Sequence, residues 1–157
     1  CYLVVTKNNR LQIAQIIETE AYIGTDDQAS HARFGITDRN RLMWGPPGVF
    51  YVYLIYGLHY LFNIICQPEN EPAAVLIRAL APVSGIDGPL DGPAKLTKTL
   101  GITKAQNGLD ITSAKDIFIS APRSPIPASS IVTSPRIGIN YASEPWRSLP
   151  WRFRLSV

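Results

Sequence analysis

Polar and apolar residues alternate with a period of two near the start of the chain, and this pattern predicts strands. The first ten residues alternate in this way at Leu3 and Val5, and residues 10–23 read RLQIAQIIETEAYI. Residues at alternate positions share a face of a strand. The second segment therefore has a packed, mostly apolar face and a chemically reactive face: Ile17, Thr19, Ala21 and Ile23 on the first, and Ile16, Glu18, Glu20 and Tyr22 on the second.

Two apolar segments rich in aromatic and β-branched residues follow, at Val49–Ile55 and Leu58–Cys66. Tyr56 and Gly57 separate them, so the pattern favours a β-hairpin with its turn at these two residues. A single apolar helix is the alternative, and the glycine together with the Val, Ile and Tyr content argues against it.

Two short helices are predicted from their end signals. Thr25 and Gln28 have the spacing of a capping box, which predicts a helix of about two turns over Asp26–Phe34. Residues 92–101 read GPAKLTKTLG, with proline at the first helical position and glycine just after the last.

Further short strands are predicted at Ala73–Leu80, Asp116–Ser120 and Arg136–Ile139, before an end rich in Trp and Arg, Trp146–Leu155. Thirteen prolines, none of them before residue 46, favour short strands joined by turns over a helical bundle. We therefore expect one α+β domain over residues 1–157. It would be a mainly antiparallel curved sheet or open barrel with a protruding β-hairpin and short helices.

The net charge of +3 hides an uneven distribution. Up to Pro122 there are ten basic and eleven acidic residues, whereas the remainder holds five arginines against Glu144: Arg123, Arg136, Arg147, Arg152 and Arg154. A solvated basic tail and a surface that binds a polyanion both fit this pattern.

Composition excludes several classes of protein. Two cysteines, Cys1 and Cys66, cannot form a disulfide framework or a Cys-rich zinc site, and they favour a reduced intracellular protein. The apolar stretch 49–66 contains glycine, histidine, asparagine and tyrosines, which argues against a membrane span. With two histidines and no phosphate-binding loop, we expect no metal and no cofactor.

Glu18 and Glu20 are the first residues that packing alone does not explain. On one strand face they lie about 6.6 Å apart, close enough for each carboxylate to influence the proton affinity of the other. Either could activate a water as a general base. The chain has no lysine between Lys7 and Lys95, so water is the expected nucleophile. An ordinary solvated strand face is the alternative for this pair.

Three other polar residues lie in or near apolar segments. Asn63 and Arg78 each interrupt an apolar strand, where an unpaired polar group costs about 1–3 kcal/mol, so each needs either a protein partner or a ligand. His31 could be an ordinary histidine that is either hydrogen-bonded within the protein or exposed to solvent. The predicted helix follows the glutamate strand directly, however, and could place His31 beside Tyr22.

Aromatic residues also occur where a core cannot take them up. Tyr56 stands beside the glycine of a tight turn, so we expect it to be exposed and to insert into a partner or a base stack. Met43 and Trp44, close to Arg39 and Arg41, predict a second exposed apolar tip flanked by cations. Aromatics interleaved with arginines suit single bases and phosphates.

Seven motifs occur in one order along the chain: ETEAYIG, DDQASHAR, RNRLMW, GVFYVYLIYG, LHYLFNI, VLIRAL and DGPAKL. Together they resemble the alkyladenine (3-methyladenine) DNA glycosylase family of animals and many bacteria, which is not the helix-hairpin-helix type. The resemblance extends from about residue 10 to the end, where PRIGI and PWRFRL also fit. That family has a further segment before the position of Cys1, so we expect an N-terminal segment to be missing from the domain.

The resemblance implies a base excision repair enzyme that hydrolyses the N-glycosidic bond of alkylated or deaminated purines flipped out of duplex DNA, without lyase activity. Glu20 matches the general base that activates water, and Glu18 is left with a supporting role. Tyr22 and His31 match residues that enclose the base, Tyr53 an aromatic on its other face, and Asn63 an asparagine that refuses guanine. The implied DNA contacts are the wedge Tyr56 with the apolar Met43 and Leu76 beside it, and the cations Arg39, Arg41 and Arg78.

The expected partner is double-stranded DNA that contains damaged purines. We expect the protein to bind it as a monomer and not to associate with a membrane. The expected location is intracellular, in the nucleus of a eukaryote or the cytoplasm and nucleoid of a bacterium. A non-catalytic nucleic-acid-binding barrel is the main alternative. A carbohydrate glycosidase that uses Glu18 and Glu20 is a weaker one. Base release from a duplex with one hypoxanthine distinguishes these possibilities.

Overall fold

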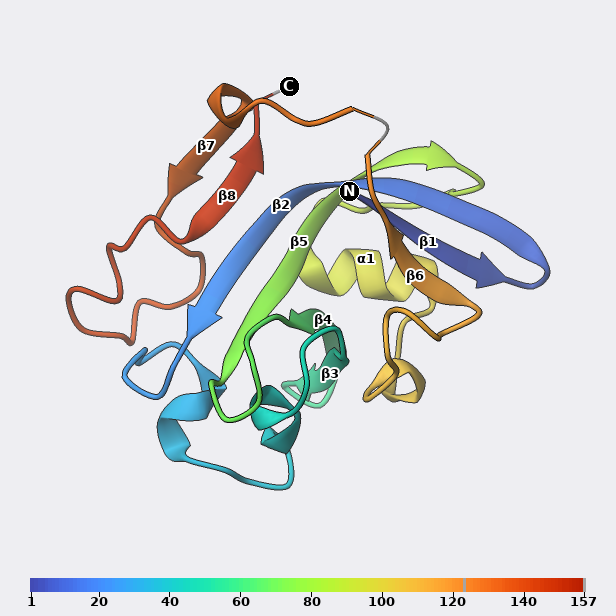
Figure 1. Cartoon of the computed structure of the whole chain (residues 1–157). Coiled ribbons are helices and arrows are strands. Elements are labelled where there is room, and N and C mark those ends of the chain that lie inside the picture. Colours follow the sequence, from blue (N-terminus) through green and yellow to red (C-terminus); the bar gives the residue numbers. More distant parts are fainter. Residues whose placement is uncertain (123, 157) are drawn as a thin grey trace.

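The structure, a computed structural model, describes residues 1–122 and 124–156, so Arg123 of the basic end lies outside the described residues. Eight strands form one sheet in the order β3-β4-β5-β2-β1-β6, with β8 beside β2 and β7 beside β8 (Figure 1). The strands are β1 (Tyr2–Lys7), β2 (Arg10–Ile23), β3 (Phe50–Ile55), β4 (His59–Ile65), β5 (Ala73–Ser84), β6 (Ile117–Ser120), β7 (Ile131–Ser134) and β8 (Arg152–Leu155).

Strand β2 organises the sheet because it pairs with three other strands. Strand β5 follows one edge of β2, while β1 and then β8 share the other edge. Register shifts interrupt the β2–β5 ladder on both sides of Glu18, and such bulges bend a strand and increase its twist. The sheet is accordingly curled and antiparallel, and the predicted α+β class is confirmed.

The two faces of β2 do not divide into a packed and an open one, since most of the residues on both faces are half-buried. Ile23, on the expected packed face, is 43% exposed, whereas Glu20 on the reactive face is fully buried. The polar face is covered because segments from elsewhere in the chain lie against it. Because it is buried, the Glu20 carboxylate is not part of an ordinary solvated strand face, which was the alternative for this pair.

The hairpin predicted after residue 48 is confirmed, and the helical alternative is wrong. Strands β3 and β4 pair antiparallel from Phe50 opposite Ile64 to Ile55 opposite His59, so residues 56–58 form the loop. Their inward side chains join the main core, which lies between the curled sheet and helix α1 (Pro93–Leu100).

Helix α1 begins and ends where the sequence predicts. Gly92 precedes it, and Gly101 closes it in the left-handed conformation, with a φ of 72°. Its apolar side, Leu96 and Leu100, is buried against β4 and β5 beneath the bend of the sheet (Figure 1). The remaining helices are single 3₁₀ turns: η1 (His31–Phe34), η2 (Arg41–Trp44), η3 (Lys104–Gln106) and η4 (Ala128–Ser130).

Two predicted elements are wrong. The helix expected over Asp26–Phe34 is only the turn η1, capped by the Ser30 hydroxyl, because the Asp27 carboxylate binds the backbone N–H groups of Ile23 and Ala29 and folds this segment into a turn. The strand expected at Arg136–Ile139 is an irregular segment, because Arg136 turns inward to Asp27. Among the described residues, no helix is long and apolar enough to cross a membrane.

Candidate active site

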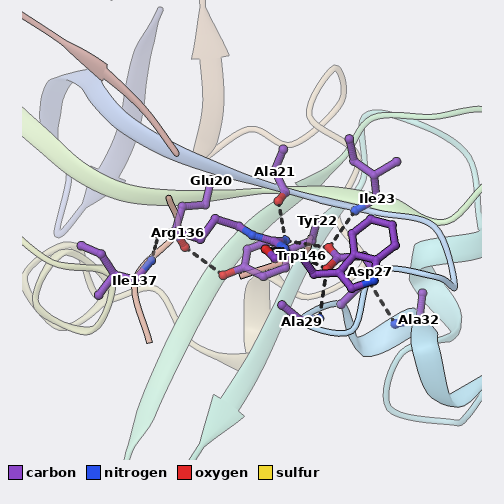
Figure 2. Close-up of polar contacts among 11 residues, drawn as sticks. Glu20, Ala21, Tyr22, Ile23, Asp27, Ala29, Ala32, Arg136, Ile137 and Trp146 are labelled. Atoms are coloured by element: carbon purple, nitrogen blue, oxygen red, sulfur yellow. Dashed lines mark hydrogen bonds and ion pairs between the residues drawn. The ribbon is translucent and has the colours of Figure 1, made fainter. Parts of the chain in front are cut away.

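Glu20 lies at the centre of the candidate site, fully buried in β2 between β5 and β8. Tyr22 donates its hydroxyl to Oε2 at 2.8 Å, and Nη1 of Arg78 reaches the same oxygen at 3.4 Å. The backbone N–H of Ile137 donates to Oε1 at 2.7 Å (Figure 2). Both carboxylate oxygens therefore have fixed partners, and these partners define one orientation.

Glu18 lies on the same side of β2 as Glu20, as the alternation predicted. Its side chain is 15% exposed, and Oε1 contacts Nε of Arg78 at 3.1 Å and Nη1 of Arg152 at 3.5 Å. Arg78 thus bridges the two glutamates, which answers how a charge is tolerated within strand β5. The structure brings the predicted pair and this arginine together.

A small aromatic cavity lies beside the Glu20 carboxylate. Its lining includes all four residues predicted for a base pocket together with four others: Tyr22, His31, Tyr53 and Asn63, with Ala29, Met43, Tyr51 and Ala74. The cavity volume is about 20 Å³, enough for about one water. The Tyr22 hydroxyl joins this cavity to Glu20.

His31 is held in the cavity wall by a hydrogen bond between its Nδ1 and the hydroxyl of Tyr51, 2.9 Å apart. Burial, together with the smaller effect of the Arg39 and Arg33 charges, lowers the pKa of His31 to about 4. The imidazole is therefore neutral at physiological pH, with one ring nitrogen as donor and the other as acceptor. Burial raises the pKa of Tyr51 to about 12, so its hydroxyl stays protonated.

His31 and Tyr53 lie against each other on one wall of the cavity. Their ring centroids are 4.4 Å apart, whereas a base between two rings needs about 7 Å, twice a contact distance of about 3.5 Å. The expectation that a base has His31 and Tyr53 on opposite faces therefore does not fit this conformation. Asn63 has a protein partner, since its Nδ2 donates to the Tyr51 carbonyl at 3.1 Å.

Met43 and Leu76, the predicted apolar contacts beside the wedge, are both buried, at 2% and 3% exposed. The exposed tip predicted at Met43 and Trp44 is therefore wrong. Helix η2 turns Met43 inward, where it packs in a cluster with Tyr51 and lines the cavity. Leu76 lies within the sheet, opposite Glu20 in the β2–β5 register.

Tyr56 marks the tip of the β3–β4 hairpin and is 86% exposed, as predicted. Its φ of 52° is uncommon for a residue other than glycine and belongs to the tight loop. Leu58 in the same loop is 76% exposed. Arg39 donates from Nη2 to the Leu54 carbonyl at 2.7 Å and so lies along this hairpin, while Arg41 is exposed on η2.

The four described arginines of the basic end divide between the interior and the surface. Its ion pairs are Arg136 with Asp27, Arg152 with Glu18, and Arg147 with Glu144. Arg154 is exposed. Arg136 and Arg152 are therefore engaged with carboxylates inside the protein, whereas Arg147 and Arg154 lie at the surface.

Sequence reasoning missed three residues that contact the Glu20 centre or support it. Ile137 contributes a backbone N–H, which no residue type signals. Asp27 and Arg136 form a buried ion pair one residue away from that N–H. The sequence does contain a signal for this ion pair, since an aspartate and an arginine occur in two of the matching motifs, DDQASHAR and PRIGI.

This arrangement has a definite chemical capacity. A buried, oriented carboxylate can take a proton from water and stabilise positive charge that develops on a substrate. Aromatic rings beside it can bind a planar ring by stacking. The site therefore suits hydrolysis of a bond next to a planar, aromatic group.

Comparison with known proteins agrees with this chemical interpretation of the site. A sequence model of the methylpurine-DNA glycosylase family matches residues 1–157. A protein of Myxococcus xanthus is 43% identical over 152 residues, covering 96% of this chain and 77% of its own length. One of Carboxydothermus hydrogenoformans is 45% identical, covering 99% and 84%. One of Anaeromyxobacter dehalogenans strain 2CP-C is 47% identical, covering 90% and 67%. All three are named as candidate 3-methyladenine DNA glycosylases.

Proposed function

This chain belongs to the methylpurine-DNA glycosylase family, and from that premise we propose that it excises alkylated or deaminated purines from duplex DNA. Membership makes it a DNA-repair hydrolase whose substrate is DNA. The finer proposal concerns the lesions, of the 3-methyladenine, hypoxanthine and ethenoadenine type, the extrusion of the base, and the residues that act on it.

One observation carries the proposal: Glu20 is fully buried, with both carboxylate oxygens oriented, beside an aromatic cavity. In the proposed reaction the bond between sugar C1′ and the purine nitrogen breaks, and the base leaves with the bonding electrons. Positive charge develops on the sugar, as in glycoside hydrolysis. Glu20 faces this charge and takes a proton from the water whose oxygen bonds to C1′.

The proposed base pocket is the aromatic cavity. Tyr22, His31 and Tyr53 would supply stacking surfaces, and Asn63 an amide that clashes with the exocyclic amine of guanine. A volume of about 20 Å³ is too small for a purine, so these rings must separate as a base enters. Extruding a base costs a few kcal/mol, least for damaged or mispaired bases, and stacking in the pocket offsets that cost.

The proposed DNA contacts lie along the hairpin and near Glu18. Tyr56, exposed at the tip, would enter the minor groove and fill the space that the base leaves. Met43 and Leu76 would support this region from the interior. Positive charge would come from Arg39, Arg41 and Arg78, so binding should weaken as salt concentration rises.

We also propose that the enzyme is monofunctional and acts as a monomeric single domain. Strand cleavage by a glycosylase requires an amine that attacks the sugar, and the cavity lining contains no lysine among the described residues. The product is then an abasic site in an intact strand. Denaturing gels with and without alkali separate base release from strand cleavage, and gel filtration reports the oligomeric state.

The decisive experiment measures release of hypoxanthine from a duplex that contains one hypoxanthine. Glu20→Gln should keep its affinity for this duplex and lose about 10²–10⁴-fold in single-turnover rate, the usual contribution of a general base. Undiminished release would exclude Glu20 as the base. Tight DNA binding by a wild-type chain that releases no base from a panel of purine lesions would favour the non-catalytic binding module.

A second variant tests the wedge. Tyr56→Ser should weaken binding to the lesion duplex and slow base release, because nothing then fills the vacated space. Val83→Ser, at another exposed apolar position, is the matched control. Equal affinities for the two variants would remove Tyr56 from the DNA interface.

A further inference from the structure

Arg136 and Asp27 form an ion pair in which both side chains are fully buried. The contact is bidentate, with Nη1 to Oδ2 at 2.6 Å and Nη2 to Oδ1 at 2.8 Å (Figure 2). The Asp27 carboxylate also accepts the backbone N–H groups of Ile23 and Ala29. Four donors therefore fix this carboxylate in the turn that follows β2.

The guanidinium of Arg136 is held by four of its five N–H groups, and its buried Nε has no hydrogen-bond partner among the described residues. Nη1 also donates to the Ala21 carbonyl at 2.9 Å, and Nη2 to the Trp146 carbonyl at 3.2 Å. Its central carbon lies 4.7 Å from the ring centre of Tyr22 and 5.0 Å from that of Trp151, both within cation–π range. Arg136 thus connects the C-terminal segment to β2 and contacts the ring of Tyr22, which lines the candidate base pocket.

Both oxygens of Glu20 depend on groups that Arg136 holds. The next residue, Ile137, donates its N–H to Oε1, so the position of Arg136 sets the position of that donor. The Tyr22 hydroxyl donates to Oε2, and the face of its ring rests on the guanidinium. Arg78, the third donor, comes from β5 and is independent of this contact.

A buried ion pair is a poor source of stability, because desolvation of two charges cancels most of their attraction, and an apolar pair of similar volume often stabilises as well. What an apolar pair lacks is direction. A bidentate, planar contact permits one geometry only. The pair therefore suits the task of placing two donors on one carboxylate.

We propose that Asp27 and Arg136 are positioning residues for base excision: they hold the Ile137 N–H and the Tyr22 hydroxyl on the two oxygens of Glu20. This inference rests on the proposed glycosylase function. It gives the C-terminal segment a part in catalysis without any contact with the substrate. It also predicts that loss of the pair slows the chemical step more than it weakens DNA binding.

The test compares Arg136→Lys, which keeps the charge but cannot make the bidentate contact, with wild type and with the control Asp91→Asn in an exposed pair on α1. Arg136→Lys should stay folded by circular dichroism and lose about 100-fold in single-turnover release of hypoxanthine, since a misplacement of about 1 Å can cost that much. Its dissociation constant for the lesion duplex should change less than threefold. A folded variant with a rate within threefold of wild type would overturn the proposal.

A second variant covers the case in which the lysine does not support folding. The double substitution Asp27→Leu with Arg136→Met replaces the pair by apolar side chains of similar volume, and should fold while losing the rate in the same way. A folded double variant with the wild-type rate would show that the pair serves packing only.

A readout without DNA separates this inference from the proposed function. In wild type the ¹⁵N-labelled amide of Ile137 should be protected from hydrogen exchange and should shift in Glu20→Gln. In Arg136→Lys that protection should be lost, whereas in Asp91→Asn it should remain. Protection that persists in Arg136→Lys contradicts the positioning role. A protected amide in a wild type that releases no base contradicts only the glycosylase assignment.

Discussion

Two of the arginine–carboxylate pairs at strand β2 lie in different environments. Arg136 and Asp27 are fully excluded from solvent and joined by two short contacts. Arg78 and Glu18 are 14% and 15% exposed and joined by one contact of 3.1 Å. The first pair is confined to a single geometry, whereas the second retains access to water and to other charges. The comparison shows one pair held entirely inside the fold and another that is partly open to solvent.

The difference predicts a hierarchy of effects on stability. Removing one member of a buried pair leaves a charge without compensation, whereas water replaces a partner lost at the surface. Substitutions ranked by the burial of the pair should therefore rank by their effect on the free energy of unfolding.

The largest effect is expected for Asp27→Ala. It strands the Arg136 guanidinium in the interior and should lower the free energy of unfolding by about 3–5 kcal/mol, the usual result of breaking a buried pair. Urea unfolding followed by tryptophan fluorescence measures this loss. A loss below about 1 kcal/mol would mean that water reaches Arg136, and the contrast between the pairs would fail.

Acidification should produce the next largest effect, through His31 in the cavity wall. The pKa of His31 is about 4 in the folded protein and about 6.5 when unfolded. The unfolded chain therefore binds more protons between these values. Neutral His31 therefore makes its full contribution to the free energy of unfolding above pH 6.5. This contribution is lost as the pH falls towards 4. Urea unfolding at pH 7.5 and 4.5 should show a smaller loss for His31→Gln than for wild type, and parallel losses would contradict burial of a neutral imidazole.

Glu18→Ala should have a smaller effect, about 1 kcal/mol, because its pairs with Arg78 and Arg152 are partly solvated. The effect should shrink in 0.5 M NaCl, since salt screens exposed charges. Measuring Glu18→Ala and Asp27→Ala at low and high salt sharpens the comparison. A salt-independent loss for Glu18→Ala would place this pair with the buried one.

The smallest effect is expected for Asp91→Asn, the control substitution. Asp91 and Lys95 form an exposed pair on α1, at 74% and 54% exposed. The midpoint of thermal unfolding should match that of wild type within experimental error. A clear shift would show that exposure is a poor guide to the strength of these pairs.

Much of the fold could be predicted from local patterns. The β3–β4 hairpin and helix α1 are specified by residues close in sequence, a glycine at a turn and a proline and glycine at the two ends of a helix. The predictions failed where distant residues decide. Thr25 and Gln28 match the start of a helix, but the Asp27 carboxylate folds this segment into a turn by binding the N–H groups of Ile23 and Ala29. Arg136, 109 residues away, holds the same carboxylate.

The candidate site divides along the same line. Glu20, Tyr22, His31, Tyr53 and Asn63 could be singled out from the resemblance, and the structure gathers them around one cavity and its neighbouring carboxylate. The Ile137 N–H could not, because every residue except proline has such a group and only the fold selects one. The arginines near the end of the chain fit a surface that binds a polyanion, but the side chain of Arg136 is buried against Asp27.

The hydrogen bond between Glu20 and Ile137 joins residues 117 positions apart. A ribosome delivers the amino-terminal part of a chain first, so the carboxylate and most of the aromatic cavity emerge long before the segment that orients them. A nascent or truncated chain would thus carry the reactive group without its alignment. The orientation of Glu20 therefore forms only once the segment around residue 137 has been made and has folded against β2.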